Sequence, residues 1–283
     1  MNRLPCTDRR CPMAKKIVKR MIQSTWEYRL FDIAAQMAYY FLLALFPLLI
    51  VLLSILHFFP VGVHDVLVLI QPYVPEQLLS FIAANLSDVL DVRRTETLSI
   101  STLVTVWMTL MGSFAVIRAV NSAYQFPDPP FIRMVLVGFV LVFTLLTAVI
   151  VSLLFPVFGE PIGRFIFTLL GLEESMQIFW SFIRWGISFL VVGVVLLILY
   201  IIVPSQRMSW RDTWPGALFA TVGWQAASLG FSYFNQWNDY TIIYGGLGTI
   251  IGLMVWFFLT AFMILLGAQL NAVMMDIHRV DKR

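Results

Sequence analysis

The longest run without an ionisable side chain limits what this chain can fold into. Residues 240–275 contain no Asp, Glu, Lys, Arg or His, and Asp239 and Asp276 flank the run. A helix needs only about 20 apolar residues to cross the hydrocarbon core of a bilayer. Backbone groups in that core must be satisfied within the segment, which favours a helix. We therefore predict a membrane-spanning helix over residues 244–272.

Five more uncharged runs reach spanning length. The composition agrees with a membrane protein, because 60% of the residues are hydrophobic and 12% are charged, against roughly 25% charged residues in soluble domains. We expect an all-α fold: a polytopic membrane helical bundle of six transmembrane helices with short amphipathic interfacial helices. The predicted spans are 34–59, 98–117, 134–158, 185–203, 213–234 and 244–272.

The distribution of positive charge predicts the orientation of these spans. The N-terminal flank, the second–third and fourth–fifth connections and the C-terminus carry 15 of the 19 Lys and Arg residues, and the other side carries 4. Cytoplasmic loops carry the excess of Lys and Arg. Both termini are therefore expected in the cytoplasm of a multi-pass protein of the cytoplasmic membrane. This gives a basic N-terminal tail with an interfacial helix (1–33), a transmembrane domain (34–275) and a cytoplasmic tail (276–283).

Three segments outside the spans have helical periodicity. Before the first span, apolar residues alternate with lysines between Ile17 and Trp26, as in a helix that lies on an anionic leaflet. Residues 75–90 and, more weakly, 160–179 indicate similar helices on the outer side. Each of the three is equally compatible with a packing role.

The N-terminal segment contains a second candidate start site. Met13 precedes a basic segment that is a natural start for a membrane protein, so residues 1–12 are interpreted as an upstream start-site extension. N-terminal sequencing that finds Met1 or Asn2 on the cellular protein would contradict this interpretation.

Charged and amide side chains at the membrane borders are the candidate substrate-binding residues. Inside the spans no ionisable residue occurs apart from the terminal His57, which disfavours a relay of membrane carboxylates. A border arginine can hold a phosphate headgroup. Amides can either line a vestibule or hydrogen-bond between helices. The candidates are Tyr39, Arg118, Asn121, Arg184, Gln269 and Asn271.

Glycines and one proline are candidates for a structural or hinge role. Pro47 lies within the first span, where it removes a backbone donor and should bend the helix. Small residues spaced four apart let helix backbones approach closely. Such residues begin the fifth and sixth spans, and the ones we single out are Gly216, Gly245, Gly248 and Gly252.

No pattern of catalytic or metal-ligating residues is present. The three histidines are scattered, and Cys6 and Cys11 lack a second ligand pair. We expect no enzymatic activity, no metal and no cofactor. The net charge of +3 follows from the basic tail, so we expect no nucleic-acid partner.

Three blocks of sequence resemble the YihY/BrkB family of bacterial inner-membrane proteins. The first block matches through Ala38, Tyr39 and Pro47, and the second, IRAVNSAYQF, through Arg118, Ala119, Asn121 and Tyr124. The third matches through Tyr200, Pro204, Pro215, Gly216, Ala217, Trp224, Tyr233, Tyr244, Gly245, Trp256, Gly267 and Asn271.

The resemblance implies six helices and an activity that is poorly settled. The family once carried the label ribonuclease BN, which is regarded as a misassignment, and some members are linked to serum resistance or to lipid export. Where the family pattern often has glutamate, this chain has Gln269. A mechanism that needs a charge at that position therefore does not transfer to this protein.

The leading functional hypothesis is a transporter that moves a lipid or amphiphile between leaflets. Its expected partners are membrane lipids, and the sequence leaves a homo-oligomer or an envelope partner open. The alternative is a non-transporting structural or assembly protein of the envelope, which predicts a bundle without a cavity. A tRNA-processing ribonuclease is the remote alternative.

Overall fold

The computed structural model describes residues 13–56, 98–169, 173–237 and 247–281, and within these ranges every regular element is an α-helix. The predicted all-α class is therefore confirmed. The helices are α1 (Met13–Glu27), α2 (Leu30–Leu56), α5 (Leu98–Ala123), α6 (Phe131–Leu169), α7 (Glu173–Ile202), α8 (Trp210–Trp237) and α10 (Leu247–Asp281).

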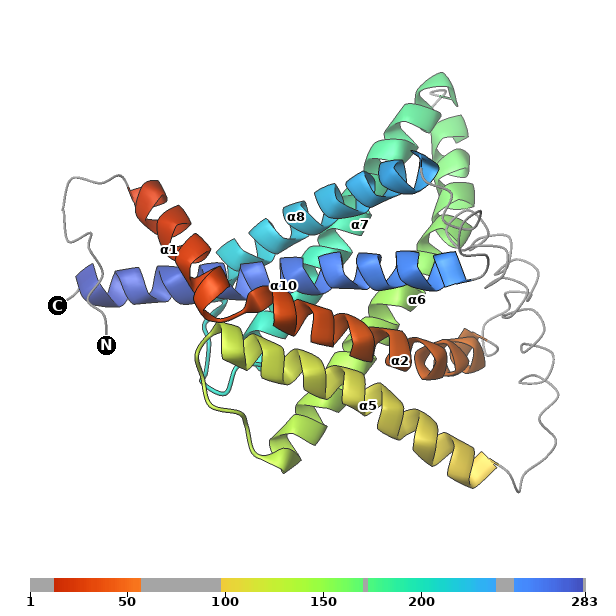
Figure 1. Ribbon diagram of the computed structural model, residues 1–283. Helices are drawn as coiled ribbons and strands as arrows, with labels where there is room; N and C mark the ends of the chain where they lie inside the picture. The colour runs from red at the N-terminus through yellow and green to blue at the C-terminus, as the bar shows by residue number, and fades with distance from the viewer. Residues whose placement is uncertain (1–12, 57–97, 170–172, 238–246, 282–283) are drawn as a thin grey trace.

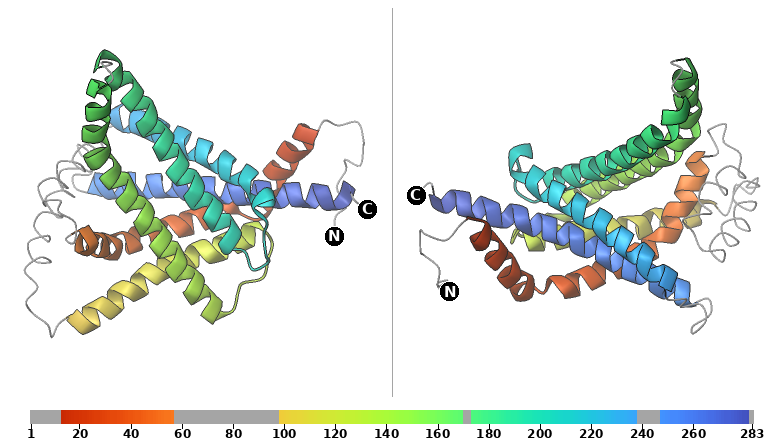
Figure 2. Two further views of the ribbon diagram at one scale, coloured as in Figure 1. Left: turned by 180° about the vertical axis from the view of Figure 1, so that it is seen from behind. Right: turned by 90° about the horizontal axis from the view of Figure 1, so that it is seen from above.

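Six of these helices contact one another in a closed order. α2 packs beside α5, α5 beside α6, α6 beside α7, α7 beside α8, α8 beside α10, and α10 beside α2 again. α10 also contacts α5 and the short helix α1, and α2 also contacts α1 and α6, so these two helices are central to the bundle. α6 and α7 form a layer behind the other four helices (Figures 1 and 2).

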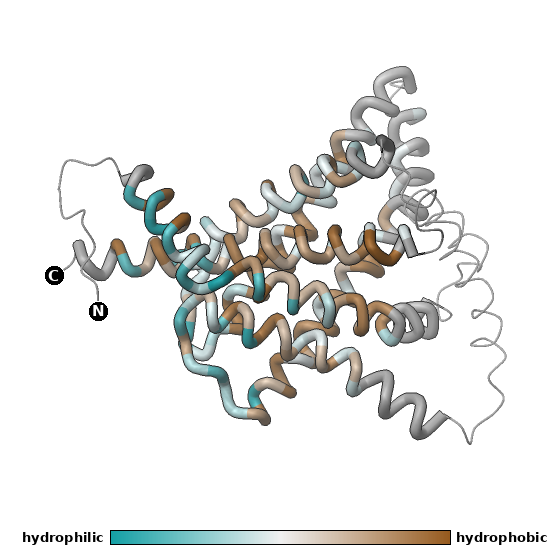
Figure 3. Tube along the Cα trace, viewed as in Figure 1, coloured by the Kyte–Doolittle hydropathy of each residue, from teal (hydrophilic) through white to brown (hydrophobic). Residues whose placement is uncertain are grey.

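One end of the bundle gathers most of its described polar structure. The connections 124–130 and 203–209 lie at this end, together with α1 and the start of α2 (Figure 1). We call it the connection end. Hydrophilic residues concentrate here, whereas the helices become hydrophobic away from it (Figure 3). This distribution is what a membrane border requires, and it is the end that the charge pattern predicts to face the cytoplasm.

Among the helices that the structure describes, three are long and apolar enough to cross a bilayer. They contain the segments Phe131–Ser152, Trp185–Ile202 and Ile250–Ile277, with mean hydropathies of 2.9, 2.7 and 2.5. Only 17–22% of these apolar windows is buried inside the protein, so their outward side chains need an apolar surrounding. The other predicted spans fall on α2, α5 and α8, and the count of six remains a prediction.

The structure differs from the expected surface helices at one place and agrees at another. Residues 160–179 were expected to form a separate surface element, but α6 continues to Leu169 and α7 begins at Glu173. The apolar residues there extend the two long helices instead. The N-terminal segment does form a helix, α1, which ends at a turn where Arg29 has a positive φ of 49°. Residues 75–90 lie outside the described ranges.

A backbone-to-backbone helix crossing joins α8 to α10. A Cβ atom added to Gly216 would overlap the carbonyl oxygen of Gly267, and one added to Gly267 would overlap the Tyr200 hydroxyl and the Ala220 side chain. Glycine at both positions lets the two backbones touch. The Tyr200 hydroxyl donates to the carbonyl oxygen of Ile264 over 2.7 Å and so joins α7 to the same crossing.

This crossing predicts a large difference between two glycines of α8. Gly216→Ala should lower the free energy of unfolding by about 1–3 kcal/mol, because the added methyl group overpacks the contact with α10. Gly230→Ala is the matched control, since its Cβ meets nothing within 4 Å and alanine favours a helix by roughly 0.5–1 kcal/mol. The measurement is the thermal midpoint of each variant in detergent. Equal midpoints for the two variants would contradict the close crossing.

Candidate functional site

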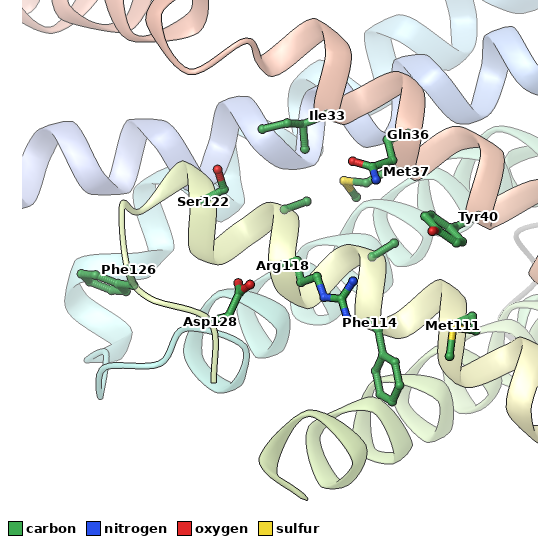
Figure 4. Close-up of a pocket in the computed structure, with 12 residues that line it drawn as sticks. Ile33, Gln36, Met37, Tyr40, Met111, Phe114, Arg118, Ser122, Phe126 and Asp128 are labelled. Atoms are coloured by element: carbon green, nitrogen blue, oxygen red, sulfur yellow. The ribbon is translucent and has the colours of Figure 1, made fainter. Parts of the chain in front are cut away.

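A cavity of about 430 Å³ lies between α2 and α5 near the connection end (Figure 4). Its walls combine apolar, neutral polar and charged side chains. The lining residues are Ile33, Gln36, Met37 and Tyr40 of α2, Met111, Phe114, Ala115, Arg118, Ala119 and Ser122 of α5, and Phe126 and Asp128 of the connection that follows α5.

The cavity follows the facing surfaces of the two helices. The lining residues recur at intervals of three and four on both α2 and α5, which is the spacing of one helical face. From Met111 to Ser122 the α5 wall runs for about 17 Å, roughly half of the ~30 Å hydrocarbon core. The cavity is therefore a groove that begins at the connection end and extends part of the way along the bundle.

The groove ends where α2 and α5 approach closely. A Cβ atom added to Gly112 would lie 2.8 Å from the Cβ of Ala44, closer than two carbon atoms can pack. Gly112 therefore permits a contact that leaves no room between the helices at this level. Tyr40 and Met111 are the lining residues next to this contact along the two helices.

Two charged residues of opposite sign line the groove without pairing. Arg118 and Asp128 are both exposed. Within the described part of the chain, no ion pair within 4.0 Å and no hydrogen bond involves the side chain of either one. The other polar lining residues, Gln36, Tyr40 and Ser122, are neutral. Both charges are thus available to a ligand, and the groove carries no net formal charge.

Asn121, one turn from Arg118, has a structural environment instead. It is fully buried, and its Nδ2 donates to the carbonyl oxygens of Ile117 at 2.8 Å and Val203 at 3.3 Å. Its Oδ1 accepts the backbone N–H of Ser205 over 2.7 Å. Arg133 donates to the carbonyl oxygens of the same turn, those of Pro204 and Ser205, at 2.6 and 2.7 Å. These bonds tie the end of α7 to α5 and α6.

Asn271 plays the same part for α8 and α10. It is fully buried, its Oδ1 accepts the Gly216 N–H over 2.7 Å, and its Nδ2 donates to the Thr213 carbonyl at 3.1 Å and to the Tyr124 hydroxyl at 3.0 Å. Burial raises the pKa of Tyr124 well above its usual value, so this phenol stays neutral and can accept the bond. One amide thus joins α10 to α8 and to the connection after α5.

Gln269 faces a different neighbour, the helix α1. Its exposed fraction is 1%, its Nε2 donates to the Met21 carbonyl over 3.2 Å, and its Oε1 lies 3.1 Å from the Thr25 hydroxyl. The amide therefore connects α1 to α10. Gln269, Asn271 and Asn121 do not line the groove; Arg118 is the predicted binding residue that does.

The remaining predicted residues lie apart from the groove or outside the described part of the chain. Tyr39 is 52% exposed and does not line the groove, and its ring packs edge-on against that of Tyr40 at 5.6 Å. The side chain of Arg184, in α7, lies outside the description, as does Gly245. Gly248 is buried in α10, and a Cβ on Gly252 would make only an ordinary contact of 3.8 Å with Phe231. Pro47 is buried inside α2, which changes direction along its length (Figure 2).

Sequence reasoning missed Asp128, Ser205 and Arg133. Asp128 stands between prolines in a short connection, where a charge is ordinarily a solvated surface residue. The available signal was its position in the sequence, just beyond the end of the helix that carries Arg118. Nothing local in the sequence indicates that Ser205 and Arg133 meet, because 72 positions separate them.

Among the residues that the structure describes, no group of three or more His, Cys, Asp or Glu side chains could hold a metal ion. The groove offers a guanidinium, a carboxylate and neutral hydrogen-bonding groups beside an apolar wall. Its chemistry is that of binding a ligand with polar and apolar parts.

These features define an all-α integral membrane protein with a groove at one end of its helix bundle. The chain matches the family described as Virulence factor BrkB over residues 21–283, and it belongs to that family. No solved structure matches the chain.

Similar proteins occur in several bacteria. The chain is 36% identical over 243 residues to YfkH of Bacillus subtilis, whose name calls it ribonuclease-like; the match covers 85% of this chain and 88% of that protein. It is 40% identical over 89 residues to a UPF0761 membrane protein of Pseudoalteromonas translucida, covering 31% of this chain and 28% of that protein. A UPF0761 membrane protein of Vibrio cholerae is 31% identical over 103 residues, which is 36% of this chain and 34% of that protein.

The contact of Gln269 with α1 predicts a loss of stability in Gln269→Glu. The side chain is 1% exposed, and a carboxylate cannot donate to the Met21 carbonyl as the amide Nε2 does. Burying a charged group without that hydrogen bond should lower the free energy of unfolding by roughly 1–3 kcal/mol or more.

The measurement compares the thermal midpoints of the variant and the parent protein in the same detergent. Gln23→Glu, the same substitution at an exposed position of α1, is the control and should keep the midpoint of the parent protein. Equal midpoints for Gln269→Glu and Gln23→Glu would contradict the prediction.

Proposed function

We propose that the protein is a transporter of the bacterial cytoplasmic membrane that moves a lipid or another amphiphile between leaflets, without an enzymatic step. The observation that carries the proposal is the groove between α2 and α5, in which unpaired charges lie beside apolar side chains. A lipid has the same combination of a charged headgroup and apolar chains.

The two parts of the groove suit the two parts of such a ligand. The Arg118 guanidinium offers a planar set of N–H donors that matches a phosphate. Ile33, Met111 and Phe126 of the wall, which are partly exposed, provide apolar surface for the adjoining chain, and methionine adapts to irregular shapes. The position of the groove, next to the polar connection end, is where a headgroup would enter.

Transport also needs a path past the end of the groove. The contact of Gly112 with Ala44 closes the space between α2 and α5, so a headgroup can pass only if the two helices separate there. A two-state bundle that opens at this contact would alternate between access from one leaflet and from the other. Because Gly112 and Ala44 are both small, the closed contact is tight. Opening it displaces no large side chain.

The envelope-assembly alternative differs in what it predicts for lipids. A purely structural bundle would neither bind a headgroup at Arg118 nor accelerate its movement. The ribonuclease-like description belongs to the name of the Bacillus relative, and our proposal assigns no such activity to this chain.

Reconstituted protein should accelerate the movement of chain-labelled phospholipids between the leaflets of vesicles. Arg118→Gln should lower the rate by about tenfold, because a charge-assisted hydrogen bond contributes roughly 1.5–3 kcal/mol. Arg207→Gln, which removes an exposed arginine at the same end of the bundle but outside the groove, is the matched control. No acceleration by the parent protein, with any of several headgroups, would overturn the proposal.

A disulfide across the closed contact should stop transport. Ala44→Cys and Gly112→Cys, combined in a background in which Cys6 and Cys11 are replaced by serine, place two thiols close enough to bond after a shift of about 1 Å. Oxidation should abolish lipid movement, and reduction should restore it. The single-cysteine variants treated in the same way are controls. Undiminished transport by fully cross-linked protein would show that the path does not pass between α2 and α5.

A further inference from the structure

The groove holds one positive and one negative side chain at separate points. Arg118 projects from the α5 wall, and Asp128 lines the groove from the connection beyond the helix (Figure 4). No nitrogen of the Arg118 side chain lies within 4.0 Å of a carboxylate oxygen of Asp128, so the two groups form no salt bridge. Neither side chain bonds to another described side chain.

Hydrogen bonds fix the backbone that carries Asp128. The end of α5 is a Schellman turn: the N–H of Phe126 donates to the Asn121 carbonyl over 2.9 Å, the N–H of Gln125 donates to the Ser122 carbonyl over 3.0 Å, and Gln125 has a φ of 59°. The Ser205 hydroxyl lies 2.7 Å from the carbonyl oxygen of the next residue, Pro127. The chain therefore leaves α5 in one defined direction, which fixes where the backbone of Asp128 stands relative to that of Arg118.

The rest of the groove adds no formal charge. Gln36, Tyr40 and Ser122 are the other polar lining residues, and they donate or accept hydrogen bonds without favouring either sign. A ligand with a phosphate alone would gain from Arg118 but would be repelled by Asp128. A ligand with a phosphate and an ammonium group can satisfy both side chains at once.

We infer that the groove selects an amphiphile with a zwitterionic headgroup, with its phosphate at Arg118 and its ammonium group at Asp128, over one whose headgroup is only anionic. The inference rests on the proposed function, because it assigns the substrate class of the same site. It makes Asp128 the residue that sets specificity. Removing its charge should favour the anionic headgroup and disfavour the zwitterionic one.

The test is equilibrium binding to the full-length protein in detergent, measured by calorimetry with two short-chain lipids, dihexanoyl phosphatidylethanolamine and dihexanoyl phosphatidylglycerol. The parent protein should bind the ethanolamine lipid more tightly. Asp128→Asn should shift the ratio of the two dissociation constants toward phosphatidylglycerol by about two- to fivefold, the range expected for an exposed charge pair. Asp276→Asn, at an exposed position of α10 outside the groove, should leave the ratio unchanged.

A third ligand separates a lipid from a soluble zwitterion. Glycerophosphoethanolamine has the same headgroup without acyl chains, so it should bind more weakly than the lipid because it forgoes the apolar wall. Binding as tight as that of the lipid would overturn the assignment of an amphiphile. A parent protein that prefers phosphatidylglycerol, or a ratio that Asp128→Asn does not change, would overturn the inference.

These outcomes are distinct from failure of the proposed function. Selective binding that depends on Asp128, together with no movement of lipid in vesicles, would retain the zwitterion site and reject transport. Transport whose rate ratio for the two headgroups is the same in the parent protein and in Asp128→Asn would retain transport and reject the zwitterion site. Both variants replace exposed side chains, and a thermal midpoint equal to that of the parent protein confirms that each is folded.

Discussion

The backbone contact between α8 and α10 at Gly216 and Gly267 is the constraint on which the rest of the bundle depends. No side chain separates the two helices there, so their crossing is set by backbone atoms. The Asn271 amide lies beside this contact and bonds to Gly216, to Thr213 and to the Tyr124 hydroxyl. These bonds join α10 to α8 and to the end of α5.

Buried polar side chains at the connection end form hydrogen bonds that hold the helices together. Among the described residues no buried side-chain nitrogen or oxygen lacks a partner, as a low-dielectric surrounding requires. Asn121 and Gln269 bond to backbone groups of other elements. What remains for a ligand is the pair of exposed charges, Arg118 and Asp128, in the groove beside this network. A fully hydrogen-bonded end next to an open groove agrees with the headgroup site that we propose.

The sequence predicts the class of fold well and the site only in part. Length and the absence of charge identify α10 because both are local properties, and helical periodicity identifies α1 for the same reason. The partners of the polar residues are not local: the contact of Thr25 with Gln269 spans 244 positions. The sequence therefore identifies the important amides, but only the fold shows that they bond to backbone groups and that Arg118 and Asp128 line the same groove.

An experimental structure in nanodiscs that contain both ethanolamine and glycerol phospholipids tests the central claim most directly. It should show Asn271 joining α8 to the connection after α5, and headgroup density between Arg118 and Asp128 with its chain against the apolar wall of α2 and α5. A bundle with the same α8–α10 crossing, but with the groove filled by side chains and bound lipid found only elsewhere, would contradict the account.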